Sequence, residues 1–336
     1  MKALFQRAYG PAHLVLELRE IDRPTVRNDE VLLRVHAASL HPDVWHVVTG
    51  RPFMLRVMGA GLRRPKNPVP GTDTAGRVEE LGAGVTGLKV GDEVFGEIIR
   101  GHQWKNGGAY AEYVAAPAAS LALKPANVSF EQAAATPTSG LIALQGVRHE
   151  GRVERGDRVL VNGAGGAVGS FAVQIAKAFG AEVTGVDSTG KQDLLRSIGA
   201  DHAIDYTRED FTRNGERYDV IVDIPGNRSF EDLKRSLTGD GRYVIIGHDN
   251  FGTTGNRWFG GTIGRILKLQ LFAPFGRPGK APPAAEPADP LTVLAEMLEA
   301  GKITPAIDRV VALNDVPDAI RLMEEGHVLG KIVVTI

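Results

Sequence analysis

Residues 158–169, RVLVNGAGGAVG, decide the fold of this chain. The stretch begins with apolar residues typical of a buried strand, enters a glycine-rich turn at Gly163 and continues into residues 170–180, where apolar side chains recur with helical spacing. Glycines let a ligand approach the backbone closely, and the free N–H groups at the start of a helix attract anions. We therefore predict a strand–turn–helix unit whose turn binds the pyrophosphate of a dinucleotide.

The residues after this unit continue the alternation of strand and helix. An apolar strand at 182–186 ends at Asp187, an acidic residue about 20 positions beyond the glycines, as dinucleotide binding often requires. Further elements are a helix at 193–198 and strands at 203–204, 218–223 and 242–247. Such an alternation predicts a doubly wound parallel sheet.

Composition limits the class of protein. The chain of 336 residues is long enough for two domains, and its net charge of -1 offers no general field for nucleic acid or an anionic membrane. It has no cysteine, which excludes disulfides, thiolate metal sites and a cysteine nucleophile. No signal-peptide core follows Met1, and no apolar run approaches the roughly 18 residues of a membrane span. We expect a cytoplasmic protein without a nucleic-acid or membrane partner.

The regions on either side of the central sheet are predicted to fold differently. Short alternating runs separated by turn residues predict a mostly antiparallel, barrel-like β domain near the N-terminus. These runs are 14–18, 30–35, 76–81 and 93–98. Ser129 is the predicted N-cap of a helix at the domain junction. Near the C-terminus we predict a proline-rich loop at 276–290, helices at 291–299 and 316–323, and strands at 303–311 and 331–336.

Several short segments follow the same order as in a known family. They are AASLHPD at 37–43, PGTDTAGRV at 70–78, VGDEVFG at 90–96, GGAYAEY at 107–113, the glycine turn, GADH at 199–202 and GKIVV at 330–334. Taken together, these segments resemble the medium-chain dehydrogenase/reductase superfamily, in its zinc-independent quinone oxidoreductase branch.

This resemblance implies an α/β protein of two domains. A GroES-like, mostly antiparallel β-barrel catalytic domain would comprise 1–124 and 302–336, and a Rossmann domain with a doubly wound parallel sheet would comprise 125–301. Similar proteins are commonly homodimers with the active site between the two domains. Zinc-dependent relatives use cysteine ligands that this chain lacks, and its nine histidines show no ligand spacing, so no metal is predicted.

The resemblance also assigns residues to the cofactor. The amides predicted to meet the pyrophosphate are those of Gly165, Gly166, Ala167 and Val168, while Gly163 shapes the turn. Tyr206 and Lys331 are similar to family positions beside the cofactor phosphates, although a half-buried strand tyrosine and a solvated turn lysine are equally good interpretations. Gly247 follows a strand and is predicted to pass close to the nicotinamide ribose.

Two local signals disagree on the identity of the nucleotide. Asp187 would bind the ribose hydroxyls of NAD(H) and repel a 2′-phosphate, unless it serves only as a helix N-cap. Ser188 and Lys191 stand where relatives that use NADPH bind that phosphate. The balance slightly favours NADP(H) over NAD(H).

His41 is the candidate catalytic residue. An imidazole beside the nicotinamide would donate a proton or a hydrogen bond to the substrate oxygen, and the alternative is a histidine with a purely structural role. Relatives place a threonine near the cofactor where this chain has Ile142, and Thr136, Thr138 or Ser139 would supply that hydroxyl instead.

Trp45 and Phe53 are the candidate substrate residues. They would line an apolar pocket for a planar substrate, or alternatively belong to a mobile flap of the core.

These features favour an NAD(P)H-dependent oxidoreductase that transfers hydride from the nicotinamide to a quinone or an α,β-unsaturated carbonyl compound without zinc. No strong general acid is visible in the sequence. One alternative is a zinc-independent alcohol or carbonyl dehydrogenase, and the other is an NADPH-binding regulatory or structural protein with little catalysis.

Overall fold

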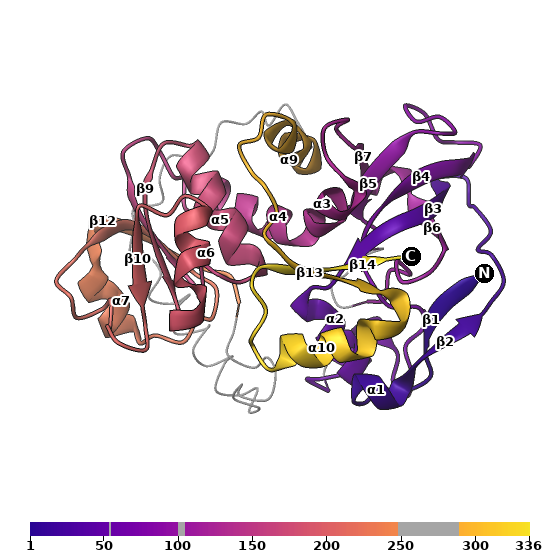
Figure 1. The fold of residues 1–336 in the computed structure, drawn as a ribbon, viewed down its shortest axis with the longest axis horizontal. Helices are drawn as coiled ribbons and strands as arrows, with labels where there is room; N and C mark the ends of the chain where they lie inside the picture. Colours follow the sequence, from indigo (N-terminus) through magenta and orange to yellow (C-terminus); the bar gives the residue numbers. More distant parts are fainter. Residues whose placement is uncertain (54, 100–104, 248–288) are drawn as a thin grey trace. The chain divides into compact units, whose positions relative to one another are not determined.

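The computed structural model describes residues 1–53, 55–99, 105–247 and 289–336 (Figure 1). The chain divides into two compact units. Unit 1 comprises Met1–Thr138, Leu291–Glu299 and Ile307–Ile336, and unit 2 comprises Ser139–Pro290 and Ala300–Ala306. Most of the proline-rich loop predicted at 276–290 lies outside the described residues. The predicted domain limits at 124 and 302 stay predictions, since the compact units divide the chain at different positions.

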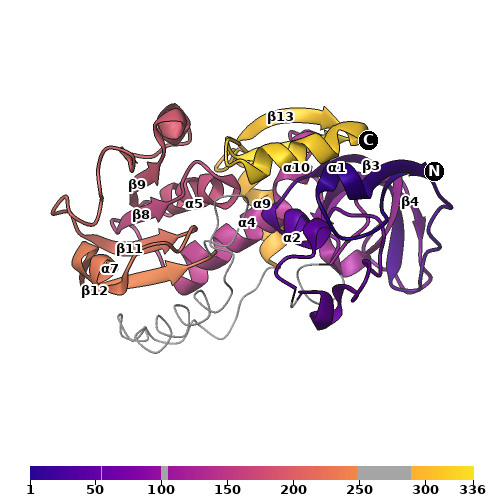
Figure 2. The ribbon, with the colours of Figure 1, turned by 90° about the horizontal axis from the view of Figure 1, so that it is seen from below.

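Unit 2 is built on a five-stranded sheet in which every neighbouring pair is parallel. Its strands are β8 (Arg158–Asn162), β9 (Glu182–Asp187), β10 (His202–Asp205), β11 (Tyr218–Asp223) and β12 (Leu237–Ile245), in the order β10-β9-β8-β11-β12. β11 and β12 lie side by side (Figure 2). The order reverses its direction at β8, the position where ligands collect in doubly wound sheets. The predicted parallel sheet is therefore confirmed.

The helices of unit 2 follow from the apolar periodicity of the sequence. They are α5 (Ala167–Ala178), α6 (Gln192–Ser197) and α7 (Phe230–Ser236). α5 starts directly after the glycine turn, and its buried side chains include Phe171, Val173 and Ile175, which are fully enclosed. Burial of this apolar face stabilises the unit by roughly 1.5–3 kcal/mol per large side chain. A second cluster joins the sheet to Phe211 and Leu233.

Unit 1 contains a mostly antiparallel seven-stranded sheet. The strands are β3 (Glu30–Ser39), β4 (Asp73–Leu81), β5 (Glu93–Glu97), β6 (Tyr113–Pro117), β7 (Leu121–Leu123), β13 (Ile307–Ala312) and β14 (Lys331–Thr335). β14 pairs with β3 with Val333 opposite Ser39, so the C-terminal strand completes a sheet begun near the N-terminus (Figure 1). β1 (Lys2–Gln6) and β2 (Leu16–Glu20) form a separate hairpin-like pair. This arrangement is the GroES-like fold that the sequence predicted.

The other helices agree with the predictions in position more than in exact limits. They are α1 (Ala12–Val15), α2 (Pro42–Thr49), α3 (Phe130–Ala135), α4 (Pro137–Leu144), α9 (Pro290–Glu299) and α10 (Val316–Glu324). Short 3-10 or π turns are η1 (Arg56–Ala60), η2 (Ala118–Ser120), η3 (Gln145–Glu150), η4 (Thr189–Lys191) and η5 (Leu313–Asp315). Ser129 caps α3 as predicted, because its hydroxyl accepts from the amide of Gln132 and the Gln132 side chain accepts from the amide of Ser129.

Two predicted strands were partly wrong. The run at 14–18 is divided, since α1 takes Leu14 and Val15 and β2 begins only at Leu16. Alternation of apolar residues over so few positions does not separate a helical turn from a strand. The strand predicted at 303–311 begins at Ile307, because residues 300–306 pack with unit 2. Within the described residues, no helix combines the length and apolarity needed to cross a membrane.

Candidate active site

The glycine turn of unit 2 is fixed by backbone hydrogen bonds to β9. The amides of Gly163 and Ala164 both donate to the carbonyl of Val186, at 2.9 and 3.1 Å. Gly163 has φ of 83°, a left-handed conformation that glycine adopts without strain. The turn is therefore built against the end of β9, next to Asp187.

The glycines differ in what their missing side chains allow. A Cβ on Gly169 would lie 2.1 Å from the carbonyl oxygen of Gly163, so this glycine permits α5 to pack onto the turn. A Cβ on Gly165 would lie 2.7 Å from the side chain of Lys191. A Cβ on Gly166 would meet the Gly163 oxygen at an ordinary 3.4 Å. Of the glycines in this turn, Gly169 is the one with the least space for a side chain.

The four amides predicted to meet the pyrophosphate differ in their partners, and their contact with a cofactor stays a prediction. The amide of Gly165 donates to Asp187 Oδ2 at 2.8 Å, and that of Gly166 donates to the Gly163 carbonyl at 3.2 Å. These two N–H groups are already used within the loop. Ala167 and Val168 occupy the first turn of α5, where amides have no acceptor inside the helix, and no side chain caps that end. They are the amides best placed for an anion.

Asp187 is buried and held by the backbone. Besides the bond from Gly165, its Oδ1 accepts from the amide of Ser188 at 2.8 Å. Lys191 Nζ lies 3.8 Å from the same oxygen, with only 14% of its side chain exposed. The alternative role of Asp187 as a helix N-cap is wrong, because Ser188 and Lys191 occupy the cap positions of η4 and α6.

Tyr206 and Gly247 lie just beyond the carboxyl ends of the two edge strands of the sheet, β10 and β12. Tyr206 follows β10, its amide donates to the carbonyl of Asp187, and its side chain is 51% exposed. Tyr206 is thus about half exposed, as the structural alternative expected, but it lies just after the strand and not within it. A Cβ on Gly247 would lie 2.4 Å from the carbonyl oxygen of Ile224. The backbone just after β11 therefore occupies the position that a side chain at residue 247 would need. Contacts of either residue with a cofactor stay predictions.

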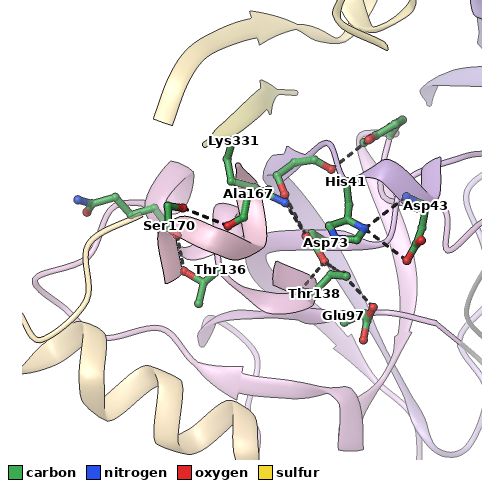
Figure 3. Close-up of polar contacts among 12 residues, drawn as sticks. His41, Asp43, Asp73, Glu97, Thr136, Thr138, Ala167, Ser170 and Lys331 are labelled. Carbon is green, nitrogen blue, oxygen red and sulfur yellow. Dashed lines mark hydrogen bonds and ion pairs between the residues drawn. The ribbon is translucent and has the colours of Figure 1, made fainter. Parts of the chain in front are cut away.

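Lys331 differs from both interpretations of the sequence. It is 1% exposed, and its ammonium contacts Asp73 Oδ2 at 3.2 Å (Figure 3). Burial lowers the pKa of Lys331, and the neighbouring Asp73 opposes that change. A solvated turn lysine is excluded by this burial. A contact with a cofactor phosphate would require the ammonium to leave its buried partner, which is costly.

The Lys331–Asp73 pair belongs to a larger buried network in unit 1. Asp73 Oδ2 also accepts from the hydroxyl of Ser39 at 3.0 Å, and Asp73 Oδ1 accepts from the amide of Thr138 at 3.1 Å. The Thr138 hydroxyl lies 2.5 Å from Asp73 Oδ1 and 2.7 Å from Glu97 Oε1 (Figure 3). Burial, and then the charge of Asp73, raises the pKa of Glu97.

Sequence reasoning missed this network. From the sequence, Asp73 was identified only as one residue of the PGTDTAGRV segment. Glu97 was identified only as one residue of a predicted strand. An acidic residue inside an apolar run is a weak signal of a buried charge, because a strand that is exposed on one face also carries acidic residues. Thr138 was considered only as a substitute hydroxyl for the cofactor.

Of the three hydroxyls considered for that contact, Thr136 donates to the carbonyl of Gln132 and Thr138 lies in the network. The Ser139 hydroxyl is buried and has no partner within the described residues. Ser139 is thus the hydroxyl that a ligand would satisfy.

His41 is the N-cap of α2. Its Nδ1 accepts from the amide of Asp43 at 3.3 Å and lies 3.3 Å from Asp43 Oδ2, and the residue is 5% exposed. The structural role considered from the sequence is therefore present. However, its Nε2 is buried without a hydrogen-bond partner in the part of the chain that is described. Buried polar atoms of this kind usually have a partner, which points to a ligand group.

The two candidate substrate residues are in different environments. Trp45 is 3% exposed within α2 and meets the ring of His46 edge-on, with centroids 4.9 Å apart. Phe53 is 60% exposed. Trp45 is thus a core side chain, while Phe53 remains available to a ligand.

The residues that the structure describes do not present the ligand set of a zinc site. The chain contains no cysteine. Over the described ranges, no group of three or more His, Asp or Glu residues is arranged to hold a metal ion. His41 Nδ1 is engaged with Asp43, and Asp73 is neutralised by Lys331. Imidazole and carboxylate ligands already paired in this way are poor zinc donors.

The fold and the loop define a two-unit dehydrogenase with a dinucleotide-binding sheet. An alcohol dehydrogenase GroES-like domain model matches residues 27–126, and a zinc-binding dehydrogenase model matches residues 198–334. A 2-methylene-furan-3-one reductase of Solanum lycopersicum is 33% identical over 99% of this chain and 79% of its own length. An NADPH-dependent alkenal/one oxidoreductase of Arabidopsis thaliana is 34% identical over the same shares.

A solved quinone oxidoreductase from Coxiella burnetii is 30% identical, with a TM-score of 0.81 over 100% of this chain and 99% of its own. The chain belongs to the medium-chain dehydrogenase/reductase superfamily and is quinone oxidoreductase-like.

Proposed function

We propose that this protein is an NAD(P)H-dependent reductase of quinones or α,β-unsaturated carbonyl compounds that works without zinc. The nicotinamide supplies hydride when bound. The names of the related reductases support this substrate class, since they act on alkenals, enones and quinones. The donor set around His41 and Asp73 supports chemistry without a Lewis acid.

The observation that carries the proposal is the unpartnered Nε2 of His41. When Nδ1 accepts from the Asp43 amide, the neutral ring carries its proton on Nε2, and the protonated ring also has an N–H there. Both forms present a donor. A hydrogen bond from this atom to the substrate oxygen would stabilise the charge that develops as hydride arrives.

For the cofactor we propose NADPH as the preferred donor. Asp187 opposes a 2′-phosphate through its charge, but both of its oxygens already accept backbone hydrogen bonds. Lys191 offsets that charge from 3.8 Å and, with Ser188, would contact the phosphate. Ser139 would offer its unpartnered hydroxyl to the nicotinamide. The homodimer and the cytoplasmic location stay predictions.

The test is oxidation of NADPH and NADH in parallel with a set of quinones and enones. Purified protein should turn over these substrates, and His41→Leu should lower kcat/KM by about 10²-fold, the scale of one general acid or hydrogen-bond donor. The KM for NADPH should not change. His13→Leu, a change of an exposed histidine in α1, is the control. Tight NADPH binding without turnover of any substrate would replace the reductase by a nucleotide-binding regulatory protein.

A further inference from the structure

One hydroxyl in unit 1 stands between two carboxyl groups. Thr138 Oγ1 is 2.5 Å from Asp73 Oδ1 and 2.7 Å from Glu97 Oε1 (Figure 3). Three oxygens in such a row need two protons for two hydrogen bonds, and the hydroxyl carries one. The second proton must come from one of the two carboxyl groups. Two ionised carboxylates would leave one short contact without a proton.

The other partners of Asp73 show which carboxyl group is ionised. Asp73 accepts from Ser39 Oγ and from the Thr138 amide, and its Oδ2 contacts the ammonium of Lys331. These groups together stabilise a carboxylate. Asp73 and Lys331, both fully enclosed, then form a neutral pair. A second negative charge beside them would have no buried counter-charge in the pair.

We propose that Glu97 is a neutral carboxylic acid that donates to Thr138, which in turn donates to Asp73, so that one proton ties these three residues together. The anchored residue is the last residue of unit 1, since the chain enters unit 2 at Ser139. The hydroxyl of Thr138 is thereby held between the two carboxyl groups at the start of α4, where the Thr138 amide also donates to Asp73. Ionisation of Glu97 would leave one of the two hydroxyl contacts without a proton and so weaken this anchor. This inference does not depend on the proposed reductase activity.

Several charged groups act on Glu97 from the surrounding elements. Asp73 of β4 and Asp43 of α2 oppose its ionisation, while His41 favours it. Lys331 of β14 also interacts with Glu97. Burial is the largest influence, and together these groups raise the pKa of Glu97.

The pH dependence has a defined sign. Because the pKa of Glu97 is higher in the folded than in the unfolded chain, its contribution to stability is complete below the unfolded pKa. It is lost as the pH rises through the folded pKa. Between the two pKa values the folding equilibrium constant should fall by up to about tenfold per pH unit, the effect of one proton.

The experiment compares urea unfolding from pH 4 to pH 9 in the unaltered protein and in Glu97→Gln. The glutamine amide keeps a donor toward Thr138 but does not titrate. We expect Glu97→Gln to remove the part of the stability loss at rising pH that comes from the release of the Glu97 proton. The matched control is Glu93→Gln on the same strand. The pKa of Glu93 is lowered by its bonds to Arg77 and Lys124, so this variant should keep the decline that Glu97 causes.

A second measurement needs no substitution. Infrared spectra of the full-length protein at pH 7 should contain the carbonyl band of a protonated carboxylic acid, which disappears at the pH where stability is lost and is missing in Glu97→Gln. An unchanged decline in Glu97→Gln would overturn the proposal. So would the absence of a protonated carboxyl band in the unaltered protein, even if the variant does not fold.

Discussion

Unit 1 and unit 2 each contain a buried aspartate beside a lysine, and the two pairs are built differently. Asp73 and Lys331 are separated by 258 residues, are fully enclosed and lie 3.2 Å apart. Asp187 and Lys191 are four residues apart, lie 3.8 Å apart and keep 9% and 14% of their side chains exposed. Asp73 accepts from two hydroxyl groups and one backbone amide besides its contact with the lysine. Asp187 accepts from two backbone amides, those of Gly165 and Ser188.

From this difference we expect a structural role for the Asp73–Lys331 pair and a ligand-binding role for the Asp187–Lys191 pair. A fully enclosed ion pair has a large desolvation cost, and only a precise set of partners offsets it, so its members are not free for a ligand. A carboxylate held by amides at the open end of a parallel sheet keeps lone pairs for hydroxyl groups of a nucleotide. We therefore expect the Asp73 pair to act on the stability of unit 1, and we propose that the Asp187 pair acts on cofactor choice.

The strongest test of this contrast replaces the two lysines by methionine. Lys331→Met leaves Asp73 ionised and enclosed, so the free energy of unfolding should fall by about 3–5 kcal/mol. Lys191→Met removes a longer, partly exposed pair and should cost about 1 kcal/mol or less. Urea denaturation at pH 7 measures both. The double variant Asp73→Asn/Lys331→Met should recover much of the loss, and equal losses for the two single variants would remove the distinction.

The next test concerns the glycine turn that holds Asp187. Gly169→Ala places a Cβ 2.1 Å from the Gly163 oxygen, so the backbone must shift, at a cost of about 1–3 kcal/mol, and NADPH affinity should fall with it. Gly166→Ala meets the same oxygen at 3.4 Å and should cost less than about 1 kcal/mol. Thermal unfolding and NADPH titration of both variants measure the two effects. If Gly166→Ala lowers stability or NADPH affinity more than Gly169→Ala does, steric room in the turn does not determine the cost of these substitutions.

A smaller effect is expected on nucleotide preference. Asp187→Asn keeps the size of the side chain but removes its charge, so the ratio of kcat/KM for NADPH to that for NADH should rise about tenfold, equivalent to about 1.4 kcal/mol. Lys191→Ala should move the ratio the other way. Steady-state kinetics with one quinone and both nucleotides measure it. A ratio that neither variant changes would show that Asp187 and Lys191 do not take part in cofactor choice.

The smallest effect is expected at the partly exposed Glu93 of unit 1, which has two cationic partners. Glu93 contacts Arg77 at 2.9 Å and Lys124 at 3.1 Å, and these bonds lower its pKa. Its contribution is present above the unfolded pKa and is lost as the pH falls through the folded pKa. Glu93→Gln should therefore reduce stability at pH 7 by less than about 1 kcal/mol, and by nothing at strongly acid pH. Urea unfolding at both pH values provides the check.

Local patterns in the sequence were enough to predict much of the fold. The apolar strand, glycine turn and apolar helix at 158–180 correspond to β8 and α5, and Ser129 caps α3 as expected. These features depend on neighbouring residues, because strand and helix periodicity and capping act over a few positions. Ordered repetition of the strand–helix pattern also predicted the parallel sheet of unit 2.

Only the tertiary structure decided which polar residues meet. Nothing near Lys331 in the sequence indicates that its ammonium is enclosed against Asp73, and nothing near Glu97 indicates a shared hydroxyl with Thr138. Burial sets the energy of a charge, and burial depends on how β4, β5, β14 and the start of α4 pack together. The sequence by itself therefore determined the order of elements and the nucleotide-binding turn. Long-range packing determined the ion pair and the surroundings that raise the pKa of Glu97, because both depend on residues distant along the chain.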